Sequence, residues 1–364
     1  MRIAYVNQDP GIDPERHKGA AVHLLAMREA LRALGAEVAC FDEPRATTLS
    51  AALEQAHGAA AFDLVYERYS LGALEGSRRA AAWGVPHVLE VNSPLTDEEQ
   101  RWRPSRGERF AEAEDPSNAR EVFARARKVI AVSSQVARYA YEQGARSGTV
   151  KIFPNGVDTS RFRPRGPGDR MRRRLVPEGR VALGFHGRLR PWHGFDAIVA
   201  AAAELLQGEF SIHLVVVGEG PYEEALAGRL PGEHVTRLDW LPHEEVAAVV
   251  ASFDLLPLAY GSDLPCYFSP LKLAEAMAAG VVPVVPRLGD LPRIVQDGWN
   301  GIVFDPENER GLVEALGALV QDGERRALLA RRARAAAEGL GWNRIAHFVI
   351  EEVGTIRPSA GTRR

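Results

Sequence analysis

Cysteine is scarce in this chain, and several signatures of metal and nucleophile chemistry are missing. Only two of the 364 residues are cysteines, Cys40 and Cys266. They form no CxxC pair and no disulfide framework, which suits a reducing compartment. The sequence also lacks HExxH, GxSxG and any Cys/His cluster with metal-ligand spacing. These absences disfavour a metal site and a serine hydrolase.

Long hydrophobic runs are also absent. No apolar stretch approaches the roughly 20 residues that span a bilayer, and the N-terminal MRIAYVNQDPG lacks a signal-peptide core. The composition, 46% hydrophobic and 26% charged with a net charge of −3, is ordinary for a soluble globular protein. It argues against nucleic acid as the main partner. We therefore expect a cytoplasmic protein, and surface association with the inner face of the membrane stays open.

What the sequence does contain is a repeated alternation of short apolar runs with longer amphipathic stretches. Such alternation is typical of a parallel sheet with helices on both faces. Strands are expected at residues 2–6, 37–41, 63–66, 87–91, 128–132 and 150–153, and again at 181–187, 211–218, 234–238, 254–258 and 281–285. The two series predict two similar α/β units.

The amino-acid composition changes at residues 154–180, where Pro, Gly and Arg dominate. This composition favours a solvated linker, although its arginine run is also suited to anion binding. We therefore expect an α/β protein with one unit over residues 1–160 and a second over residues 161–340. The amphipathic stretch within residues 341–364 predicts a C-terminal helix that returns to the first unit, followed by a tail.

The stretch SPLKLAEAMAAGVVPVV (269–285) predicts a helix entry, a short helix and a buried strand. Ser269 is expected to be the N-cap and Pro270 the first helical residue, followed by Leu271. Lys272 then lies in the first helical turn, where the helix dipole favours anions and a cation costs up to about 1 kcal/mol. A phosphate bound to the free N–H groups of that turn would make a cation favourable there.

Lys272 and Glu275 are three residues apart, so they share one face of this helix. Glu275 is suited to accept hydrogen bonds from a ribose diol. The alternative is a surface Lys–Glu pair that contributes at most about 0.5 kcal/mol, and the local pattern does not decide between the two.

A second polar loop follows the strand expected at 181–187. Arg188 comes directly after it and is suited to grip a phosphate in bidentate fashion. His193, at a helix start, adds a neutral or charged donor. The alternatives are a surface arginine and a helix-entry histidine. Gly218 and Gly220 permit a tight turn close to a ligand, but they match neither GxGxxG nor GxxxxGK[ST], so a plain turn is favoured.

Polar residues also follow the strands of the first unit, at the edge where ligands bind in open α/β sheets. Gly19 precedes a helix whose small first residues allow close backbone approach to a bound group. The candidates for contact with a bound molecule are His23, Glu67, Arg68, Glu90 and Asn92. Capping of a neighbouring helix is the alternative role for each of them.

In this order, several segments resemble glycosyltransferase family 4, the retaining nucleotide-sugar transferases with two facing Rossmann-like domains (the GT-B fold). The segments that carry the resemblance are the glycine loop before helix 20–35, AVSSQVARY (131–139), IFPNGVD (152–158), GRLRPWHGFDAI (187–198), VVVGEGP (215–221), LPHEEV (241–246), DLLPL (254–258), KLAEAMAAGVVPVV (272–285) and DGWNGIVFDP (297–306). Together they cover nearly the whole chain.

The resemblance implies transfer of a sugar from a nucleotide-diphosphate sugar to an acceptor hydroxyl, with retention, on one face and without a metal or other cofactor. It implies that the donor binds the second unit and the acceptor, a carbohydrate, lipid-linked or small molecule, binds the first. Arg188 would hold the diphosphate, Glu275 the ribose and the backbone near Leu241 the base. The implied donor-binding residues are Gly19, Arg188, His193, Leu241, Tyr267, Ser269, Pro270, Leu271, Lys272 and Glu275. The implied acceptor-binding residues are His23, Glu67, Arg68, Glu90 and Asn92.

Three positions depart from the family pattern. The family usually has a glutamate at the position of Tyr267, so the usual contact to the donor sugar is missing or replaced. The lysine that the family has shortly after Arg188 is His193 here, and we expect Lys272 to supply the lost phosphate contact. Many members have a histidine where this chain has Asn92, and the one-face reaction needs no protein base. The candidate catalytic residues are Arg188, Lys272 and Asn92.

Two other functions fit the same architecture. One is a nucleotide-sugar epimerase that acts without an acceptor, and the other is a non-catalytic sugar-nucleotide binding protein. A nicotinamide dehydrogenase is disfavoured because no GxGxxG follows the first strand of either unit. The segment WRPSRGERF (102–110) is basic and aromatic, which suits an anionic membrane surface or an acidic acceptor, although a solvated loop is the favoured interpretation.

Overall fold

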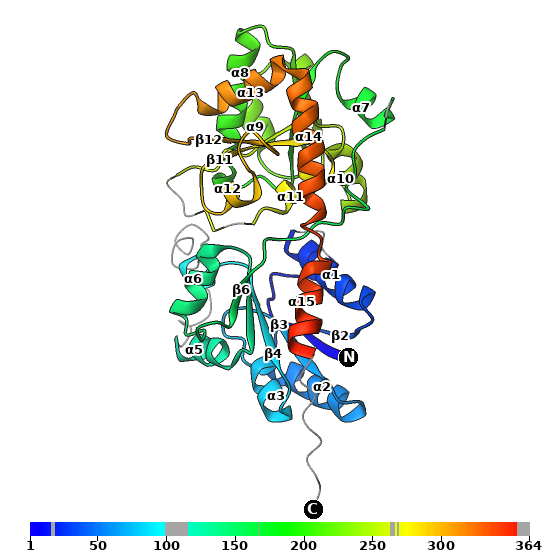
Figure 1. The fold of residues 1–364 in the computed structure, drawn as a ribbon, viewed down its shortest axis with the longest axis vertical. Helices are drawn as coiled ribbons and strands as arrows, with labels where there is room; N and C mark the ends of the chain where they lie inside the picture. Colours follow the sequence, from blue (N-terminus) through cyan, green and yellow to red (C-terminus); the bar gives the residue numbers. More distant parts are fainter. Residues whose placement is uncertain (16–18, 99–115, 167, 263–265, 268, 355–364) are drawn as a thin grey trace, which may run out of the picture. The chain divides into compact units, whose positions relative to one another are not determined.

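The computed structural model describes residues 1–15, 19–98, 116–166, 168–262, 266–267 and 269–354. The chain forms two compact units (Figure 1). Unit 1 comprises the described residues of Met1–Pro154 and Trp342–Arg364, and unit 2 comprises those of Asn155–Gly341. The expected boundary at residue 160 therefore lies inside unit 2. The basic aromatic segment 102–110 lies outside the described residues.

Unit 1 is built on a six-stranded sheet in the order β2-β1-β3-β4-β5-β6, and all of its neighbouring strands are parallel. The strands are β1 (Arg2–Asn7), β2 (Glu37–Asp42), β3 (Leu64–Arg68), β4 (His87–Val91), β5 (Lys128–Ala131) and β6 (Val150–Ile152). Every residue of β3 and β4 is buried, as expected for central strands covered on both faces. The six strands confirm the predicted series.

The helices of unit 1 include the C-terminal one. They are α1 (Gly19–Ala33), α2 (Ala46–Ala59), α3 (Glu75–Trp83), α5 (Pro116–Arg125), α6 (Ser134–Glu142) and α15 (Asn343–Gly354). Helix α15 packs against α1 (Figure 1), so the predicted return of the C-terminal helix to the first unit is confirmed. At this contact the ring of Trp342 lies 4.7 Å from that of His23, centroid to centroid.

Unit 2 repeats the design with the strand order β12-β11-β10-β7-β8-β9, again with all neighbours parallel. The strands are β7 (Val181–His186), β8 (Ile212–Val217), β9 (Val235–Leu238), β10 (Leu255–Pro257), β11 (Val282–Pro286) and β12 (Ile302–Phe304). Five of the six were predicted. The sequence analysis did not identify β12, a three-residue edge strand too short to give a periodic pattern.

Helices cover the sheet of unit 2, and α14 packs against α11 (Figure 1). The helices are α7 (Arg170–Leu175), the 3-10 helix η1 (Pro191–His193), α8 (Phe195–Gln207), α9 (Tyr222–Leu226), the 3-10 helix η2 (Gly232–His234), α10 (His243–Val250), α11 (Leu271–Ala278), α12 (Leu291–Ile294), α13 (Gly311–Gln321) and α14 (Gly323–Glu338). None of the helices in the described ranges is long and apolar enough to cross a bilayer.

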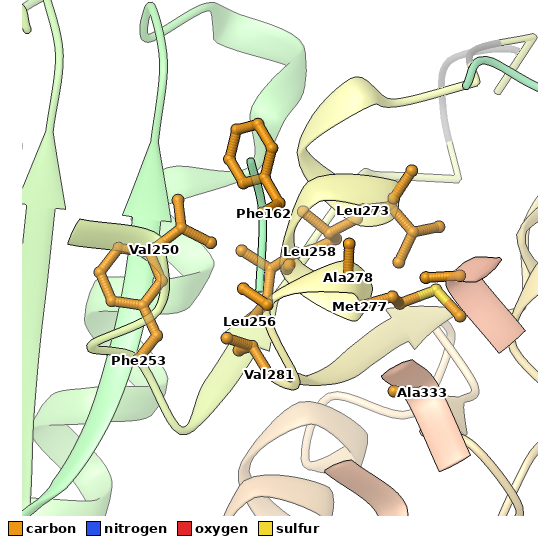
Figure 2. Close-up of a cluster of buried hydrophobic side chains, with 14 of the residues drawn as sticks. Phe162, Val250, Phe253, Leu256, Leu258, Leu273, Met277, Ala278, Val281 and Ala333 are labelled. Carbon is orange, nitrogen blue, oxygen red and sulfur yellow. The ribbon is translucent and has the colours of Figure 1, made fainter. Parts of the chain in front are cut away.

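The prediction of a solvated linker at 154–180 is wrong. Phe162 is only 1% exposed and packs in the core of unit 2 with residues such as Phe253 and Leu273 (Figure 2). Arg165 and Arg172 are not an anion site, because both pair with Asp254, at 2.7 and 2.9 Å. The segment therefore folds as part of unit 2, and arginines that suggested solvent exposure serve to fix it there.

The strand orders locate the ligand edge of each unit. In unit 1 the chain leaves β1 toward β2 and later returns to the other side of β1 as β3. In unit 2 it leaves β7 toward β8 and β9 and returns to the other side of β7 as β10. In open parallel sheets the crevice for a ligand opens beyond the carboxyl ends of the strands at such a reversal. A ligand is therefore expected at the carboxyl ends of β7 and β10 in unit 2 and at those of β1 and β3 in unit 1.

Candidate active site

In unit 2 the arginine loop follows β7 directly, and helix α11 (Leu271–Ala278) begins after β10. The loop, defined as Gly187–Leu189, bonds to the turn after β8: Gly187 N–H donates to the carbonyl of Val217 and Leu189 N–H to that of Glu219, at 2.9 and 2.8 Å. The reversal point of this sheet thus brings two of the predicted donor-binding segments to one edge.

The start of α11 differs from the expectation. Pro270, not Ser269, is the N-cap, and no side chain of the described residues caps the helix. Lys272 is consequently the second helical residue rather than the third. The Ser269 hydroxyl faces Asn155 instead of the helix, and it accepts a hydrogen bond from the backbone N–H of Asn155 at 2.6 Å. A tertiary contact has therefore replaced the predicted local cap. In the first turn of α11 the Leu273 N–H donates to the Pro270 carbonyl at 3.1 Å, and the N–H groups of Leu271 and Lys272 are left without a partner among the described residues.

Lys272 points its ammonium group toward the strand end. Its Nζ lies 4.2 Å from the ring centroid of Phe185 in β7 and is buried, with no hydrogen-bond partner among the described residues. Burial lowers its pKa from the ordinary 10.5 to about 7, although the nearby Glu275 acts in the opposite direction. Of the two alternatives left open by the sequence, the surface Lys–Glu pair is thus not what this residue forms. A cation that no described residue pairs, beside a helix N-terminus, is an arrangement that an anion would stabilise.

Glu275 lies on the same helix and is buried between two histidines. His186, the last residue of β7, places its Nε2 2.8 Å from one carboxylate oxygen, and His243, the first residue of α10, places its Nε2 2.9 Å from the other. Burial alone would raise the pKa of Glu275, but the hydrogen bonds from the two imidazoles outweigh it and lower the pKa to about 2. The carboxylate is therefore ionised and held in one orientation.

The protonation of His243 follows from its second contact. Its Nδ1 lies 3.1 Å from a guanidinium nitrogen of Arg161, and a guanidinium can only donate. His243 Nδ1 is therefore the acceptor, and the proton that reaches Glu275 is on Nε2. Burial lowers the pKa of His186, against the opposing effect of Glu275. The group Arg161–His243–Glu275–His186 is a connected chain of donors and acceptors.

Two glycines let the neighbouring turn support the arginine loop. A Cβ at Gly218 would lie 2.1 Å from the carbonyl oxygen of Gly187, and one at Gly220 would lie 2.6 Å from the Cβ of Leu189. The Tyr222 hydroxyl also donates to the Gly187 carbonyl at 2.6 Å. The turn after β8 thus fixes the conformation of the arginine loop.

Arg188 and His193 differ in the charge and the hydrogen-bond donors that they present to a ligand. The Arg188 side chain is 48% exposed, and its nearest carboxylate is that of Glu219, at 3.9 Å, so its donors are open to a ligand. His193 is neutral, because burial and the cations Lys272 and Arg190 lower its pKa to about 2. Its Nδ1 accepts the Arg190 N–H at 3.2 Å, so its proton is on Nε2. The neutral imidazole of His193 carries no positive charge, so it does not replace the charge of a lysine. The ammonium group of Lys272 lies close enough to lower the pKa of His193, so it places a positive charge near the same position.

The remaining predicted donor-binding residues are distributed around this edge. Leu241 packs partly buried against the core of unit 2, while the adjacent Trp240 is 36% exposed. Tyr267, Pro270 and Leu271 are half-buried. Gly19 belongs to unit 1, where it is the first residue of α1 and exposed.

In unit 1, four of the five predicted acceptor-binding residues form one network around Glu90. His23 Nε2 lies 2.6 Å from the Glu90 carboxylate, Arg68 lies 3.4 Å from it, and Asn92 Nδ2 donates to it as well. The Tyr66 hydroxyl donates to the second oxygen at 2.6 Å. Burial would raise the pKa of Glu90, but the contacts with His23, Arg68 and Asn92 lower it well below the usual range. This carboxylate orients donors and is unsuited to act as a base.

Glu67 lies apart from that network. Its neighbours along β3, Tyr66 and Arg68, both contact Glu90, and alternate residues of a strand point to opposite faces. Glu67 instead bonds His87 Nε2 at 2.8 Å and lies under Gly76, where a Cβ would come within 2.6 Å of the carboxylate. The structure therefore gives Glu67 a position on the opposite face of the sheet from the other four.

Sequence reasoning missed His186 and His243, the two residues that hold Glu275. The signal for His186 was a histidine at the carboxyl end of an otherwise apolar strand, and for His243 a histidine at a helix start after Pro242. Neither pattern names its partner, since the contacts span 89 and 32 residues. In the described part of the chain, no group of three or more His, Cys, Asp and Glu side chains is arranged to hold a metal ion.

Comparison with known proteins agrees with this geometry. Residues 180–322 match the family model described as glycosyl transferases group 1, and residues 42–161 match that of glycosyltransferase family 4. A relative from Nocardia farcinica, named D-inositol 3-phosphate glycosyltransferase, is 29% identical over 80% of this chain. The chain spans 66% of that relative's length, just under two thirds.

Solved structures share the fold. The Anabaena protein HepE, in complex with UDP and glucose, has a TM-score of 0.73 at 21% identity, over 98% of this chain and 100% of HepE. Sucrose-phosphate synthase from Thermosynechococcus elongatus has a TM-score of 0.72 at 18% identity, over 95% of this chain and 96% of the synthase. Two stretches of the chain are thus similar to glycosyltransferase domains, residues 42–161 to family 4 and residues 180–322 to group 1, and the two parallel sheets are the Rossmann-like domains of the GT-B fold.

Proposed function

We propose that this protein transfers a sugar from a nucleoside-diphosphate sugar to an acceptor hydroxyl, with the donor bound in unit 2. The observation that carries the proposal is Lys272. Its ammonium group is buried without a hydrogen-bond partner among the described residues, at the start of a helix that no described side chain caps. The diphosphate of a donor would supply the anion that both features call for.

Cleavage of the donor leaves negative charge on the diphosphate, and unit 2 offers three groups to stabilise it. They are the N–H groups in the first turn of α11, the ammonium of Lys272 and the half-exposed guanidinium of Arg188. Fixed donors of this kind act where the charge develops and need no rearrangement during the reaction. Gly218 and Tyr222 hold the backbone next to Arg188, which keeps that loop in place.

Glu275 is suited to hold the ribose. An ionised carboxylate has about four lone-pair directions, and His186 and His243 use one on each oxygen. Each oxygen keeps a direction in which it can accept a hydroxyl, which matches the two adjacent hydroxyls of a ribose. The histidines fix the carboxylate, so little conformational entropy is lost when the ribose binds.

The names of similar proteins support the same class of donor and acceptor. The Nocardia relative is named for transfer to an inositol 3-phosphate, and HepE was solved with UDP and glucose. For this chain we propose a nucleoside-diphosphate sugar as donor and a hydroxyl of a polyol or carbohydrate as acceptor, bound at His23, Arg68, Glu90 and Asn92.

We further propose that the reaction retains the anomeric configuration and uses no metal. The acceptor oxygen bonds to the anomeric carbon as the bond from that carbon to the diphosphate oxygen breaks, and the acceptor proton passes to the departing phosphate oxygen. The low pKa of Glu90 and its four hydrogen-bonding neighbours support a mechanism without a protein base. Lys272, Arg188 and the α11 start carry the charge that a cation would otherwise neutralise.

The first test is thermal unfolding with UDP, GDP, ADP, TDP and CDP and with their common sugars. A ligand at about 100 times its dissociation constant stabilises a protein by roughly 2.7 kcal/mol, so one nucleotide should raise the melting temperature clearly. The matching nucleotide sugar is then incubated with polyol acceptors in the presence of EDTA, and the anomeric configuration of the product is read by NMR. A protein that no nucleotide stabilises does not have the proposed donor site, and sugar conversion without any acceptor would identify an epimerase.

A further inference from the structure

The segment at the beginning of unit 2 contacts the donor helix through Asn155. Asn155 makes two hydrogen bonds to Ser269, which precedes α11: its backbone N–H donates to the Ser269 hydroxyl at 2.6 Å, and its Nδ2 donates to the Ser269 carbonyl at 2.6 Å. Its own Oδ1 is buried without a hydrogen-bond partner among the described residues. The side-chain amide of Asn155 thus bonds Ser269 through its nitrogen, while its oxygen makes no hydrogen bond within the described residues.

This contact decides what happens at the helix start. Ser followed by Pro is a favoured sequence for an N-cap and the first helical residue, and a serine in that role would bond one of the free N–H groups of the first turn. In the structure the Ser269 hydroxyl faces Asn155 instead, and Pro270 is the N-cap without a capping side chain. A cap from Ser269 would compete with an anion for the same N–H groups.

We propose that Asn155 is a positioning residue that holds the Ser269 hydroxyl away from the start of α11 and so keeps this helix end free for the diphosphate. The inference rests on the proposed function, because it concerns how the donor site is kept open. It adds a residue outside the arginine loop and α11 to the residues that determine donor affinity.

The same segment also positions Glu275, the residue of α11 that is proposed to hold the ribose. Six residues after Asn155, Arg161 bonds His243, which in turn bonds Glu275. Phe162 anchors the segment in the hydrophobic core (Figure 2). Residues 155–162 therefore fix both the start of α11, through Ser269, and its carboxylate, through His243.

The test compares Asn155→Ala with the double variant Asn155→Ala/Ser269→Ala. Asn155→Ala removes the Nδ2 bond to the Ser269 carbonyl and keeps the backbone N–H that bonds the Ser269 hydroxyl. Without the carbonyl bond that holds Ser269 beside residue 155, we expect the Ser269 hydroxyl to turn toward the start of α11 and cap it. We expect the dissociation constant for inorganic pyrophosphate, and for whichever of UDP, GDP, ADP, TDP and CDP stabilises the wild type, to rise about fivefold, the factor that a typical N-cap contribution gives. Removal of the competing hydroxyl in the double variant should restore most of the affinity. Asn308→Ala, an exposed asparagine elsewhere in unit 2, is the matched control and should bind like the wild type.

Calorimetry gives the affinities and thermal unfolding gives the stability of the ligand-free proteins. A merely structural role for Asn155 predicts that melting temperature and affinity fall together and that Ser269→Ala brings no recovery in the double variant, and that result would overturn the inference. Unchanged affinity in Asn155→Ala would also overturn it, while leaving the donor site of the wild type intact. A wild type that binds neither pyrophosphate nor any of the five nucleotides overturns the proposed function itself.

Discussion

The Nζ of Lys272 lies 4.2 Å from the ring centroid of Phe185, and the carboxylate of Glu275, which acts on its pKa, is bonded to His186 and His243 instead. The face of an aromatic ring attracts a cation, but more weakly than a carboxylate does. The lysine therefore stays in a site that only partly satisfies its charge. A buried charged group that is only partly satisfied is typical of ligand-binding sites.

The first prediction concerns the stability of the ligand-free protein. Lys272→Met keeps the approximate length of the side chain and removes a buried donor that has no partner among the described residues, so it should raise the free energy of unfolding at pH 6 by about 1–3 kcal/mol. The folded pKa of about 7 lies below the ordinary 10.5, so the cost of the buried charge is complete below pH 7 and disappears as the pH rises from 7 toward 10.5. Urea unfolding at pH 6 and pH 9.5 measures both effects.

The control for that substitution is Lys151→Met, which replaces an exposed lysine of β6. It should change the free energy of unfolding by less than about 0.5 kcal/mol at either pH. A Lys272→Met protein that is less stable than the wild type at pH 6, or whose gain is the same at both pH values, would contradict the assignment of Lys272 as a buried cation without a counter-ion.

A second prediction concerns Glu275. Glu275→Gln removes the charge that both histidines contact, and the protein should lose about 3 kcal/mol of stability at pH 7, as expected for a carboxylate whose pKa falls from 4.5 to about 2. Because the folded pKa is the lower one, this stability is complete above pH 4.5 and is lost as the pH falls toward 2. Urea unfolding between pH 3 and 7 should show that the difference in free energy of unfolding between the wild type and Glu275→Gln becomes smaller as the pH falls. Glu338→Gln, at an exposed position of α14, should show no such gap.

A third prediction tests the turn that supports Arg188. Gly218 has φ +135° and its Cβ would lie 2.1 Å from a backbone oxygen, whereas Gly228 has φ +66° with open space around its Cβ position. Gly218→Ala should therefore cost more than about 3 kcal/mol, through strain and displacement of the arginine loop, and Gly228→Ala about 1 kcal/mol, through strain alone. Thermal unfolding of the two variants compares them. Equal costs would mean that the turn after β8 does not restrain the arginine loop.

The strands and the general position of the donor site could be predicted from the sequence, and the reason is physical. Buried parallel strands are short runs of apolar residues, so eleven of the twelve are visible in the chain, and the site lies where such strands end. The fold of residues 154–180 was missed because its arginines resemble a solvated linker, while their partner Asp254 and the core around Phe162 are contributed by distant parts of unit 2.

Within the site, local rules identified residues but not their partners. Ser269 has the sequence of a helix cap, and it fails to cap because a residue 114 positions away takes its hydroxyl. Glu275 was recognised as a carboxylate on the ligand side of α11, yet the two histidines that fix it come from β7 and α10. Contacts between elements far apart in the chain depend on the packing of the whole unit, which no local pattern contains.

The last prediction concerns the pH dependence of donor binding. If the diphosphate binds beside Lys272, its affinity depends on the ammonium form of this residue. In the free protein this form is complete below pH 7 and declines above it, because the pKa is about 7. The bound anion favours the charged form and raises the pKa, so binding above pH 7 requires uptake of a proton. The dissociation constant of the nucleotide should therefore increase with pH above 7, by up to about tenfold per unit.

Two variants separate Lys272 from the other charges. Lys272→Met should bind the nucleotide about 10- to 100-fold more weakly than the wild type at pH 6, the loss expected for a charge-assisted contact of about 1.5–3 kcal/mol, and its affinity should be nearly independent of pH between 7 and 9. Lys272→Arg keeps a charge throughout that range, so any binding it retains should also be flat with pH. Calorimetry in buffers of different ionisation enthalpy counts the protons taken up directly. If the wild type takes up no proton at pH 8, or if Lys272→Met keeps the same pH profile, the charge that meets the diphosphate is not that of Lys272.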